Sequence, residues 1–319
     1  MTVIGTRGSE LALWQTHYIQ GRLGGEAAGI TTEIIKTSGD RLLDIPLQNQ
    51  LDKGFFTKEL EVALADRRVD VAVHSLKDLP TQMPPGLVLA AVPERADVGD
   101  VLFVHRDRVD LSRRLPVVAG ARVGTASMRR SALLQHVDPE AKPEFLRGNV
   151  PTRLNKAKTG ELDAVLLARA GVSRLGLDWG DLVVFDLDPQ WWLPAAAQGA
   201  LGIQARADDT ERLRLLATVH HAPSAQAVAL ERGLLRRLEG GCHSAFGALG
   251  RVDASGVATL RAGLTDTAGA WHAIEVAGDP ESLIERAYEA LQTVLAGKSH
   301  PARLDTTEAQ WATPARPWS

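Results

Sequence analysis

Short apolar runs alternate with segments of helical period along the first two thirds of the chain. In the first series, the strand-length runs "VIGTR", "TTEIIKT" and "VDVAVHS" are separated by the helix-period segments "SELALWQTHYIQGRL" and "TKELEVALADRR". This βαβαβ order predicts a mostly parallel sheet with helices on both faces. A second series of the same kind runs from "DVLFVH" to "LVVFDLD". We therefore expect two consecutive α/β domains.

A different pattern follows near His220. A helix-period segment, "APSAQAVALERGLLRRLEGG", ends at two glycines and precedes three strand-like runs, "AFGALGRVD", "ATLRAGLTD" and "WHAIEVAG", and then a last helix, "ESLIERAYEALQTVLAG". This order predicts a small α+β domain. The run "LPAAAQGALGIQAR" is expected to return to the first sheet. The predicted organisation is domain 1 at residues 1–96 with 194–217, domain 2 at 97–193, an α+β domain at 218–300 and a disordered tail at 301–319.

Composition narrows the classes of protein. The chain has 319 residues, of which 45% are hydrophobic and 24% charged, as in ordinary globular proteins. The N-terminus shows no signal-peptide pattern and no apolar run reaches membrane-spanning length, so we expect a cytoplasmic protein without a membrane partner. The single cysteine excludes a disulfide within the chain, and the formal net charge of −3 argues against a nucleic-acid partner.

Polar clusters follow predicted strands and open predicted helices in both α/β series. They are "GTRGS" with Arg7 and Ser9, "GTASMRR" with Thr125, Ser127, Arg129 and Arg130, and "LRGNVPTRL" with Arg147 and Arg153. Ser9 and Ser127 are expected to cap their helices. Arginines in a first helical turn oppose the helix dipole, and a bound anion would resolve that conflict. The alternative is that these arginines contact carboxylates on neighbouring elements.

Two further stretches carry candidate chemistry. "VAVHSLKDLPT" places Lys77 and Asp78 just after a buried strand, where Asp78 is either half of a solvated ion pair or a charge that acts on the substrate. Cys242 follows two glycines in "LEGGCHSAFG", so it lies in a loop and is either a reactive or attached thiol or a small apolar residue. The sequence contains no phosphate-binding glycine loop and no Cys/His group with the spacing of a metal site.

Taken together, these stretches resemble the porphobilinogen deaminases, also called hydroxymethylbilane synthases. The resemblance covers about residues 3–300, with the motifs in the family's order and spacing. They are "TRGSELALWQTHY", "KGFFTKELEVAL", "DVAVHSLKDLPT", "VGTASMRR", "LRGNVPTRL", "ARAGVSRLGL", "PAAAQGALGIQAR" and "LEGGC".

The resemblance implies an α/β fold of two periplasmic-binding-protein-like domains plus a small C-terminal α+β domain that carries the cofactor. It implies a transferase of tetrapyrrole (haem and porphyrin) biosynthesis that joins four porphobilinogen molecules head to tail into hydroxymethylbilane and releases four ammonia molecules. The implied cofactor is a dipyrromethane, held by a thioether to Cys242. Each substrate ring carries an acetate and a propionate, which suits arginines at strand ends. We expect a monomer.

The family's functional residues carry over by motif position. The catalytic residue is Asp78, and the mobile active-site loop contributes Lys53 and Phe56. The expected cofactor-binding residues are Cys242, Lys77, Asp78, Thr125, Ser127, Arg129, Arg130 and Gln198, and the expected substrate-binding residues are Arg7, Ser9, Arg147, Arg153 and Arg174. The chain departs from the family's pattern at Ala126, at Leu51-Asp52 and in "HSAFG" after the cysteine, which leaves the loop conformations open.

Two other classes of protein remain open on the residues alone. A non-catalytic bilobal binding protein would account for the arginine clusters and the two α/β domains, but not for the third domain or its cysteine. A thiol-dependent transferase with Cys242 as nucleophile would need a base close to the thiol, and only His243 is near in sequence.

Overall fold

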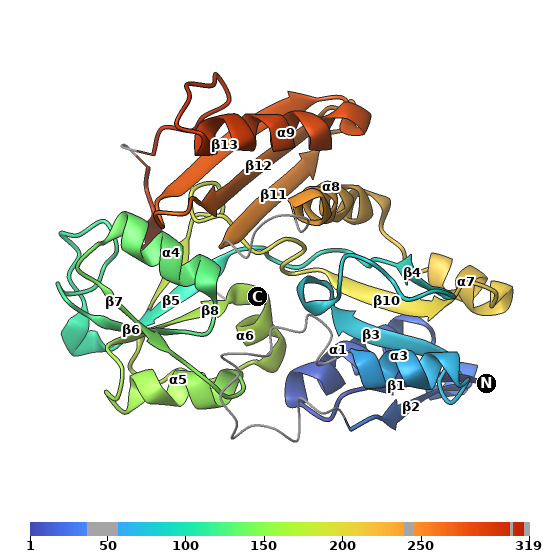
Figure 1. Ribbon diagram of the computed structural model, residues 1–319. Coiled ribbons are helices and arrows are strands. Elements are labelled where there is room, and N and C mark those ends of the chain that lie inside the picture. The colour runs from blue at the N-terminus through green and yellow to red at the C-terminus, as the bar shows by residue number, and fades with distance from the viewer. Residues whose placement is uncertain (37–56, 239–244, 307–308, 316–319) are drawn as a thin grey trace. The chain divides into compact units, whose positions relative to one another are not determined.

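The computed structural model describes residues 1–36, 57–238, 245–306 and 309–315. The chain divides into two compact units, residues 1–96 with 199–225 and residues 97–198 with 226–319 (Figure 1). Each unit is built around its own α/β sheet, and the second also contains the smaller C-terminal sheet.

The first unit contains a five-stranded sheet with the order β2-β1-β3-β10-β4. Its strands are β1 (Thr2–Thr6), β2 (Ile30–Ile34), β3 (Val71–Ser75), β4 (Leu87–Ala91) and β10 (Leu201–Arg206). Its helices are α1 (Glu10–Arg22), α3 (Lys58–Ala65) and α7 (Thr210–Ala217), with single 3-10 turns η1 (Glu26–Ala28) and η3 (Leu76–Asp78). Residues of α1 and α7 pack on one face of the sheet and residues of α3 on the other.

The central strand β3 shows why this sheet is predictable from sequence. Val71, Ala72 and Val73 are all at most 3% exposed, as expected for a strand covered by helices on both faces. The segment 193–206 was predicted to return to the first sheet, and its part that forms β10 pairs with both β3 and β4. Both of its pairings are antiparallel, so the prediction of a mostly parallel sheet is wrong here.

The second unit contains a six-stranded sheet with the order β14-β9-β5-β8-β6-β7. Its strands are β5 (Asp100–Val104), β6 (Arg122–Thr125), β7 (Lys142–Phe145), β8 (Ala164–Ala168), β9 (Val183–Leu187) and β14 (Ala312–Pro314). Its helices are α4 (Met128–Val137), α5 (Val150–Lys158) and α6 (Arg169–Leu175), with a 3-10 turn η4 (Arg106–Arg108). This sheet is also mixed, because β6 runs parallel to β7 and β8 whereas β5 is antiparallel to β8 and β9.

Strand β5 separates the two apolar cores of this sheet. Leu102 belongs to the core that contains residues of α4, and Phe103 belongs to the core that contains residues of α5 and α6. Both side chains are fully buried, so α4 covers one face of the sheet while α5 and α6 cover the other.

The C-terminal sheet, β11-β12-β13, is antiparallel throughout. It consists of β11 (Phe246–Val252), β12 (Ala258–Thr265) and β13 (Trp271–Gly278), and residues of α8 (Ala222–Leu238) and α9 (Pro280–Leu295) share its core. Leu249 and Trp271 belong instead to the apolar core that also contains Trp192 and Leu193 of the preceding segment. The predicted α+β domain therefore has its own core but packs within the second unit.

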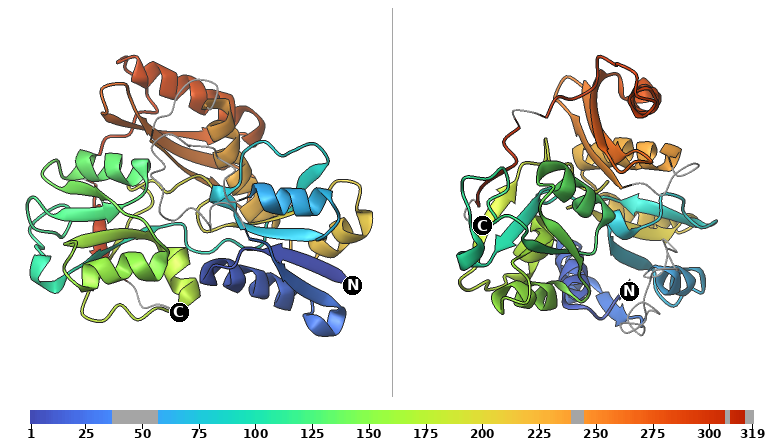
Figure 2. Two further views of the ribbon diagram at one scale, coloured as in Figure 1. Left: turned by 60° about the horizontal axis from the view of Figure 1, so that its bottom comes forward. Right: turned by 60° about the vertical axis from the view of Figure 1, so that its left-hand side comes forward.

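The tail differs from the sequence expectation. Strand β14 pairs antiparallel with β9, and Trp311 is only 2% exposed in a core of the second unit. The backbone carbonyl of Trp311 also accepts a hydrogen bond from the Asp188 N–H at 3.1 Å. In Figure 2 the red C-terminal strand lies beside the green strands of this sheet. The prediction of a disordered tail is wrong for this stretch, because burial of a tryptophan compensates for ordering the segment.

The predicted fold class, two α/β domains plus a small C-terminal α+β domain, is confirmed. Among the residues that the structure describes, none of the helices has the length and apolar character to cross a membrane.

Candidate active site

The residues predicted for the site fall in both units, and each group is described within its own unit. Three of them, Cys242, Lys53 and Phe56, lie outside the residues that the structure describes.

In the first unit, Arg7 and Ser9 occupy the connection between β1 and α1. The Ser9 hydroxyl accepts a hydrogen bond from the Ala12 N–H at 3.4 Å, so the predicted N-cap is confirmed. The side chain of Arg7 is half-buried at the end of the strand. This junction therefore presents a capped helix N-terminus next to a guanidinium, an arrangement that favours anions.

Lys77 and Asp78 follow β3 on the single 3-10 turn η3, and both side chains are exposed. The preceding His74 is 6% exposed, and its Nε2 lies 3.1 Å from Gln204 Oε1. Burial, reinforced by the charge of Arg7 and opposed by the Gln204 hydrogen bond, lowers the pKa of His74 to about 4. His74 is therefore neutral at pH 7 and structural, while Asp78 is accessible to a ligand.

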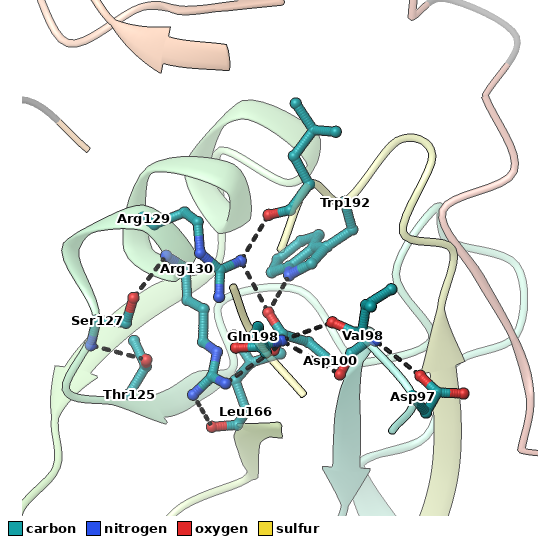
Figure 3. A network of polar contacts seen from close by, with 12 residues as sticks. Asp97, Val98, Asp100, Thr125, Ser127, Arg129, Arg130, Leu166, Trp192 and Gln198 are labelled. Carbon is teal, nitrogen blue, oxygen red and sulfur yellow. Dashed lines mark hydrogen bonds and ion pairs between the residues drawn. The ribbon is translucent and has the colours of Figure 1, made fainter. Parts of the chain in front are cut away.

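In the second unit, the connection from β6 to α4 repeats the arrangement of the first helix. The Ser127 hydroxyl accepts from the Arg130 N–H at 3.4 Å and caps α4, as predicted, and Thr125 Oγ1 accepts from the Ser127 N–H at 3.1 Å (Figure 3). Thr125 is 3% exposed, and this hydrogen bond supports the turn before α4.

Arg129 and Arg130 both point into the unit, where they meet the carboxylate of Asp100 (Figure 3). Arg129 Nη1 lies 2.9 Å from Asp100 Oδ2, and Arg130 Nη2 lies 2.8 Å from Asp100 Oδ1. Arg129 also donates to the Leu193 carbonyl oxygen at 2.7 Å, and Arg130 donates to the Leu166 carbonyl oxygen at 3.0 Å. Both arginine side chains are buried. The alternative that these arginines contact a carboxylate on a neighbouring element is therefore correct for Arg129 and Arg130.

This cluster holds two positive charges against one negative charge. Burial alone would raise the pKa of Asp100, but Arg129 and Arg130 overcome that effect and hold it well below its usual range. Arg129 Nε and Arg130 Nε are buried and have no hydrogen-bond partner among the described residues. The excess positive charge at the N-terminus of α4 favours a bound anion.

Asp100 also accepts hydrogen bonds from two other side chains. Gln198 Nε2 donates to Asp100 Oδ1 at 2.7 Å and to the Val98 carbonyl at 2.8 Å, and Trp192 Nε1 donates to Asp100 Oδ2 at 3.0 Å. Neither Asp100 nor Trp192 was predicted from the sequence to belong to the site. The available signal was an aspartate that opens an otherwise apolar strand, "DVLFV", because a buried charge in such a strand requires partners.

The remaining predicted arginines lie near the ends of β7, α5 and α6. Arg147 follows β7, with its Cζ 5.4 Å from the centroid of the Phe145 ring. Arg153 lies in the first half of α5, and its Nε donates to the Gly148 carbonyl at 2.7 Å. Arg174 lies in the last turn of α6. All three arginines are half-buried, so part of each side chain is exposed to solvent.

Comparison with known proteins identifies a family. Residues 2–214 match the family model described as "Porphobilinogen deaminase, dipyromethane cofactor binding domain". Among curated proteins, the porphobilinogen deaminase of Gloeobacter violaceus is 45% identical over 81% of this chain and 79% of its own length. The porphobilinogen deaminase of Desulforudis audaxviator is 49% identical over 78% of this chain and 79% of its own length.

Solved structures show weaker likenesses. The periplasmic VFT2 domain of Bordetella pertussis BvgS matches with a TM-score of 0.40 and 16% identity, over 68% of this chain and 86% of its own length. An ancestral cationic amino acid solute binding protein matches with a TM-score of 0.40 and 15% identity, over 68% of this chain and 87% of its own length. At these levels the likenesses add nothing to the fold described above.

Proposed function

Because the chain belongs to the porphobilinogen deaminase family of transferases, we propose that it joins four porphobilinogen molecules head to tail into hydroxymethylbilane, with release of four ammonia molecules, in tetrapyrrole biosynthesis. The observation that carries this proposal is the family match over residues 2–214, which contains Asp78 and the arginine clusters at both sets of strand ends.

The substrate-binding residues in this proposal are the half-buried polar groups that follow strands or lie near helix ends. Porphobilinogen carries two carboxylates, and guanidinium groups bind carboxylates with charge-assisted hydrogen bonds. We assign this role to Arg7, Ser9, Arg147, Arg153 and Arg174, whose partly exposed side chains support it.

The residues of the second unit fit a dipyrromethane, which carries four carboxylates. The supporting observation is the buried excess of positive charge around Asp100, with the two arginine Nε donors that lack an acceptor among the described residues. We propose that Cys242 attaches the group through a thioether and that Lys77, Asp78, Thr125, Ser127, Arg129, Arg130 and Gln198 hold it. When bound, the dipyrromethane supplies the free pyrrole α-carbon to which the first substrate is joined.

Asp78 is the catalytic residue of this proposal. When the aminomethyl group of porphobilinogen leaves as ammonia, the positive charge that develops is shared with the pyrrole nitrogen. A carboxylate next to that N–H stabilises the charge as it develops. The exposure of Asp78 on η3 leaves it available for this contact.

The Asp78→Asn variant tests this assignment. Loss of the negative charge is expected to lower turnover at least about 100-fold, because a lost electrostatic contact to a developing charge costs about that much. Porphobilinogen consumption and ammonia release are measured together, and each should fall equally. The matched control is Asp208→Asn, which removes an exposed partner of Arg67 and should retain normal turnover. Normal turnover in the Asp78→Asn variant would remove Asp78 from the mechanism.

We further propose that the enzyme acts as a cytoplasmic monomer with neither nucleic-acid nor membrane partners. The single cysteine and the ordinary charge balance of the chain support this part of the proposal. Sedimentation equilibrium of the purified protein tests the monomer, and a dimer mass would contradict it.

A further inference from the structure

A buried carboxyl group in α8 contacts a turn that leads directly to Gln198. Glu231 is 0% exposed, and its two oxygens accept hydrogen bonds from backbone N–H groups: Oε2 from Ala197 at 2.6 Å and Oε1 from Gly250 at 2.8 Å. A buried carboxylate is strongly disfavoured unless it is hydrogen-bonded, so these two contacts help to keep it in this position. Glu231 therefore ties α8 to the turn and to β11.

The turn that Glu231 contacts has an unusual backbone conformation. Ala197 has φ +62° and is 0% exposed. Residues with a Cβ disfavour the left-handed region, and such a conformation persists only where surrounding contacts hold it. The hydrogen bond from the Ala197 N–H to Glu231 is one such contact, and the Gln198 N–H closes the turn on the Ala195 carbonyl at 2.9 Å.

The edge of β11 fixes the same segment from a second side. The Ala248 N–H donates to the Pro194 carbonyl at 2.9 Å, next to the Gly250 N–H that donates to Glu231. A Cβ at Gly250 would lie 2.5 Å from the Ala227 carbonyl oxygen, so only glycine permits α8 to approach β11 this closely. That approach brings Glu231 to the edge of the strand, where it can reach Ala197.

The turn is connected to the arginine cluster through Gln198. Its amide nitrogen lies 2.7 Å from Asp100 Oδ1, and the same carboxylate receives both Arg129 and Arg130 (Figure 3). A continuous set of buried polar contacts thus runs from Glu231 through the turn at Ala197 and Gln198 to Asp100 and the two guanidinium groups.

We propose that Glu231 is a positioning residue for these arginines. Its carboxyl group stabilises the left-handed turn at Ala197, and the turn places the Gln198 amide in hydrogen-bond contact with Asp100. The carboxylate of Asp100 in turn orients Arg129 and Arg130. The inference rests on the proposed function, in which the two arginines hold the cofactor. Glu231 lies in α8, which precedes Cys242 in the sequence.

The Glu231→Gln variant tests the proposal. Glutamine keeps the shape of the side chain but replaces one of the two acceptor oxygens with an NH₂ donor, so one of the two backbone N–H groups faces a donor instead of an acceptor. In protein whose attached cofactor has been verified by mass, kcat/KM for porphobilinogen is expected to fall about 10- to 100-fold, the scale of a small misplacement of a site. The ¹⁵N-indole NMR signal of Trp192, which donates to Asp100, is expected to shift at the same time.

Adding Ala197→Gly to this variant separates positioning from general damage. Glycine adopts the left-handed region without the steric cost that alanine has, so the turn no longer depends on the carboxyl group. The double variant is expected to recover kcat/KM to within about 3-fold of the single Ala197→Gly variant and to restore the Trp192 signal. Damage elsewhere in α8 would not be rescued by a change at residue 197.

The matched control is Glu285→Gln, which removes an exposed partner of Arg237 in the same domain and should change neither readout. Unchanged kcat/KM and Trp192 signal in Glu231→Gln would overturn the proposal, as would lost activity that Ala197→Gly fails to rescue. If Glu231→Gln does not fold, Glu231→Asp replaces it: a carboxylate that is one methylene shorter should weaken the contact with Ala197 and shift the same signal. The NMR arm needs no turnover, so it tests the network even if the proposed function fails.

Discussion

Four side-chain donors from distant parts of the chain meet at the carboxylate of Asp100. Two come from α4, as Arg129 and Arg130, and the others are Trp192 and Gln198. All of these groups are buried, so each interaction acts with little screening by water. The carboxylate thus sets the orientation of both guanidinium groups and compensates one of their two charges.

Asp100→Asn is expected to lower the free energy of unfolding by about 3–5 kcal/mol, because it leaves two buried arginines without a counter-charge and places an amide N–H₂ among donors. Urea unfolding measures the loss. The matched control is Asp181→Asn, at an exposed pair with Arg106, where the expected loss is at most about 1 kcal/mol. An equal loss in the two variants would show that the buried cluster contributes no more than a surface pair.

The same comparison has a defined pH dependence. Because the folded-state pKa of Asp100 lies below its ordinary value of 3.8, the unfolded chain takes up the proton first as the pH falls. The stability that the ionised Asp100 carboxylate contributes is therefore fully present above pH 3.8 and is lost progressively as the pH falls below it. The stability difference between the wild type and Asp100→Asn should stay constant from about pH 8 to pH 5 and narrow below about pH 4. A difference that narrows already near pH 6 would contradict the assigned pKa direction.

At the scale of elements, local signals predicted local structure. The caps at Ser9 and Ser127 follow from a hydroxyl residue that immediately precedes a helical period, and the structure contains both. The run "VDVAVHS" predicted a buried strand because three consecutive apolar residues are typical of a strand covered on both faces.

Features that depend on distant residues were not predictable in this way. Arg129 pairs with Asp100, 29 positions earlier, and no local period indicates that partner. The antiparallel direction of β10 depends on where the chain re-enters the first sheet, which the pattern of apolar residues does not specify. The left-handed turn at Ala197 could not be predicted because such a turn usually has a glycine at this position. Here the hydrogen bond to Glu231 stabilises a conformation that alanine disfavours.

The C-terminal strand provides a test at this scale. Trp311→Ala is expected to lower the free energy of unfolding by about 3–5 kcal/mol, the usual cost of deleting a buried aromatic side chain. The reason is that Trp311 is 2% exposed in the core that also contains Trp192. Urea unfolding measures the effect, with the exposed neighbour Gln310→Ala as the control. A loss below about 1 kcal/mol would show that the tail adds nothing to the packing of the second unit.

At the scale of the whole molecule, the proposed reaction draws on residues from both units. Asp78 and Arg7 belong to the first, while the Asp100 cluster belongs to the second, together with α8, which precedes Cys242. The family's motifs in the sequence indicated Arg7, Asp78 and the arginines of α4, whereas no motif indicated Asp100. The family match covers residues 2–214 and so includes Arg7, Asp78 and the arginines of α4. Cys242 lies outside that range, and its role is a proposal.

The central claim is that a dipyrromethane attached to Cys242 primes the condensation of porphobilinogen. The most direct measurement is the intact mass of the denatured protein, made with porphobilinogen available and compared with a Cys242→Ser variant. The account predicts that the wild type exceeds its sequence mass by two porphobilinogens less two ammonia molecules and that the variant has no excess. A wild type with no added mass, even after incubation with porphobilinogen or preformed hydroxymethylbilane, would contradict it.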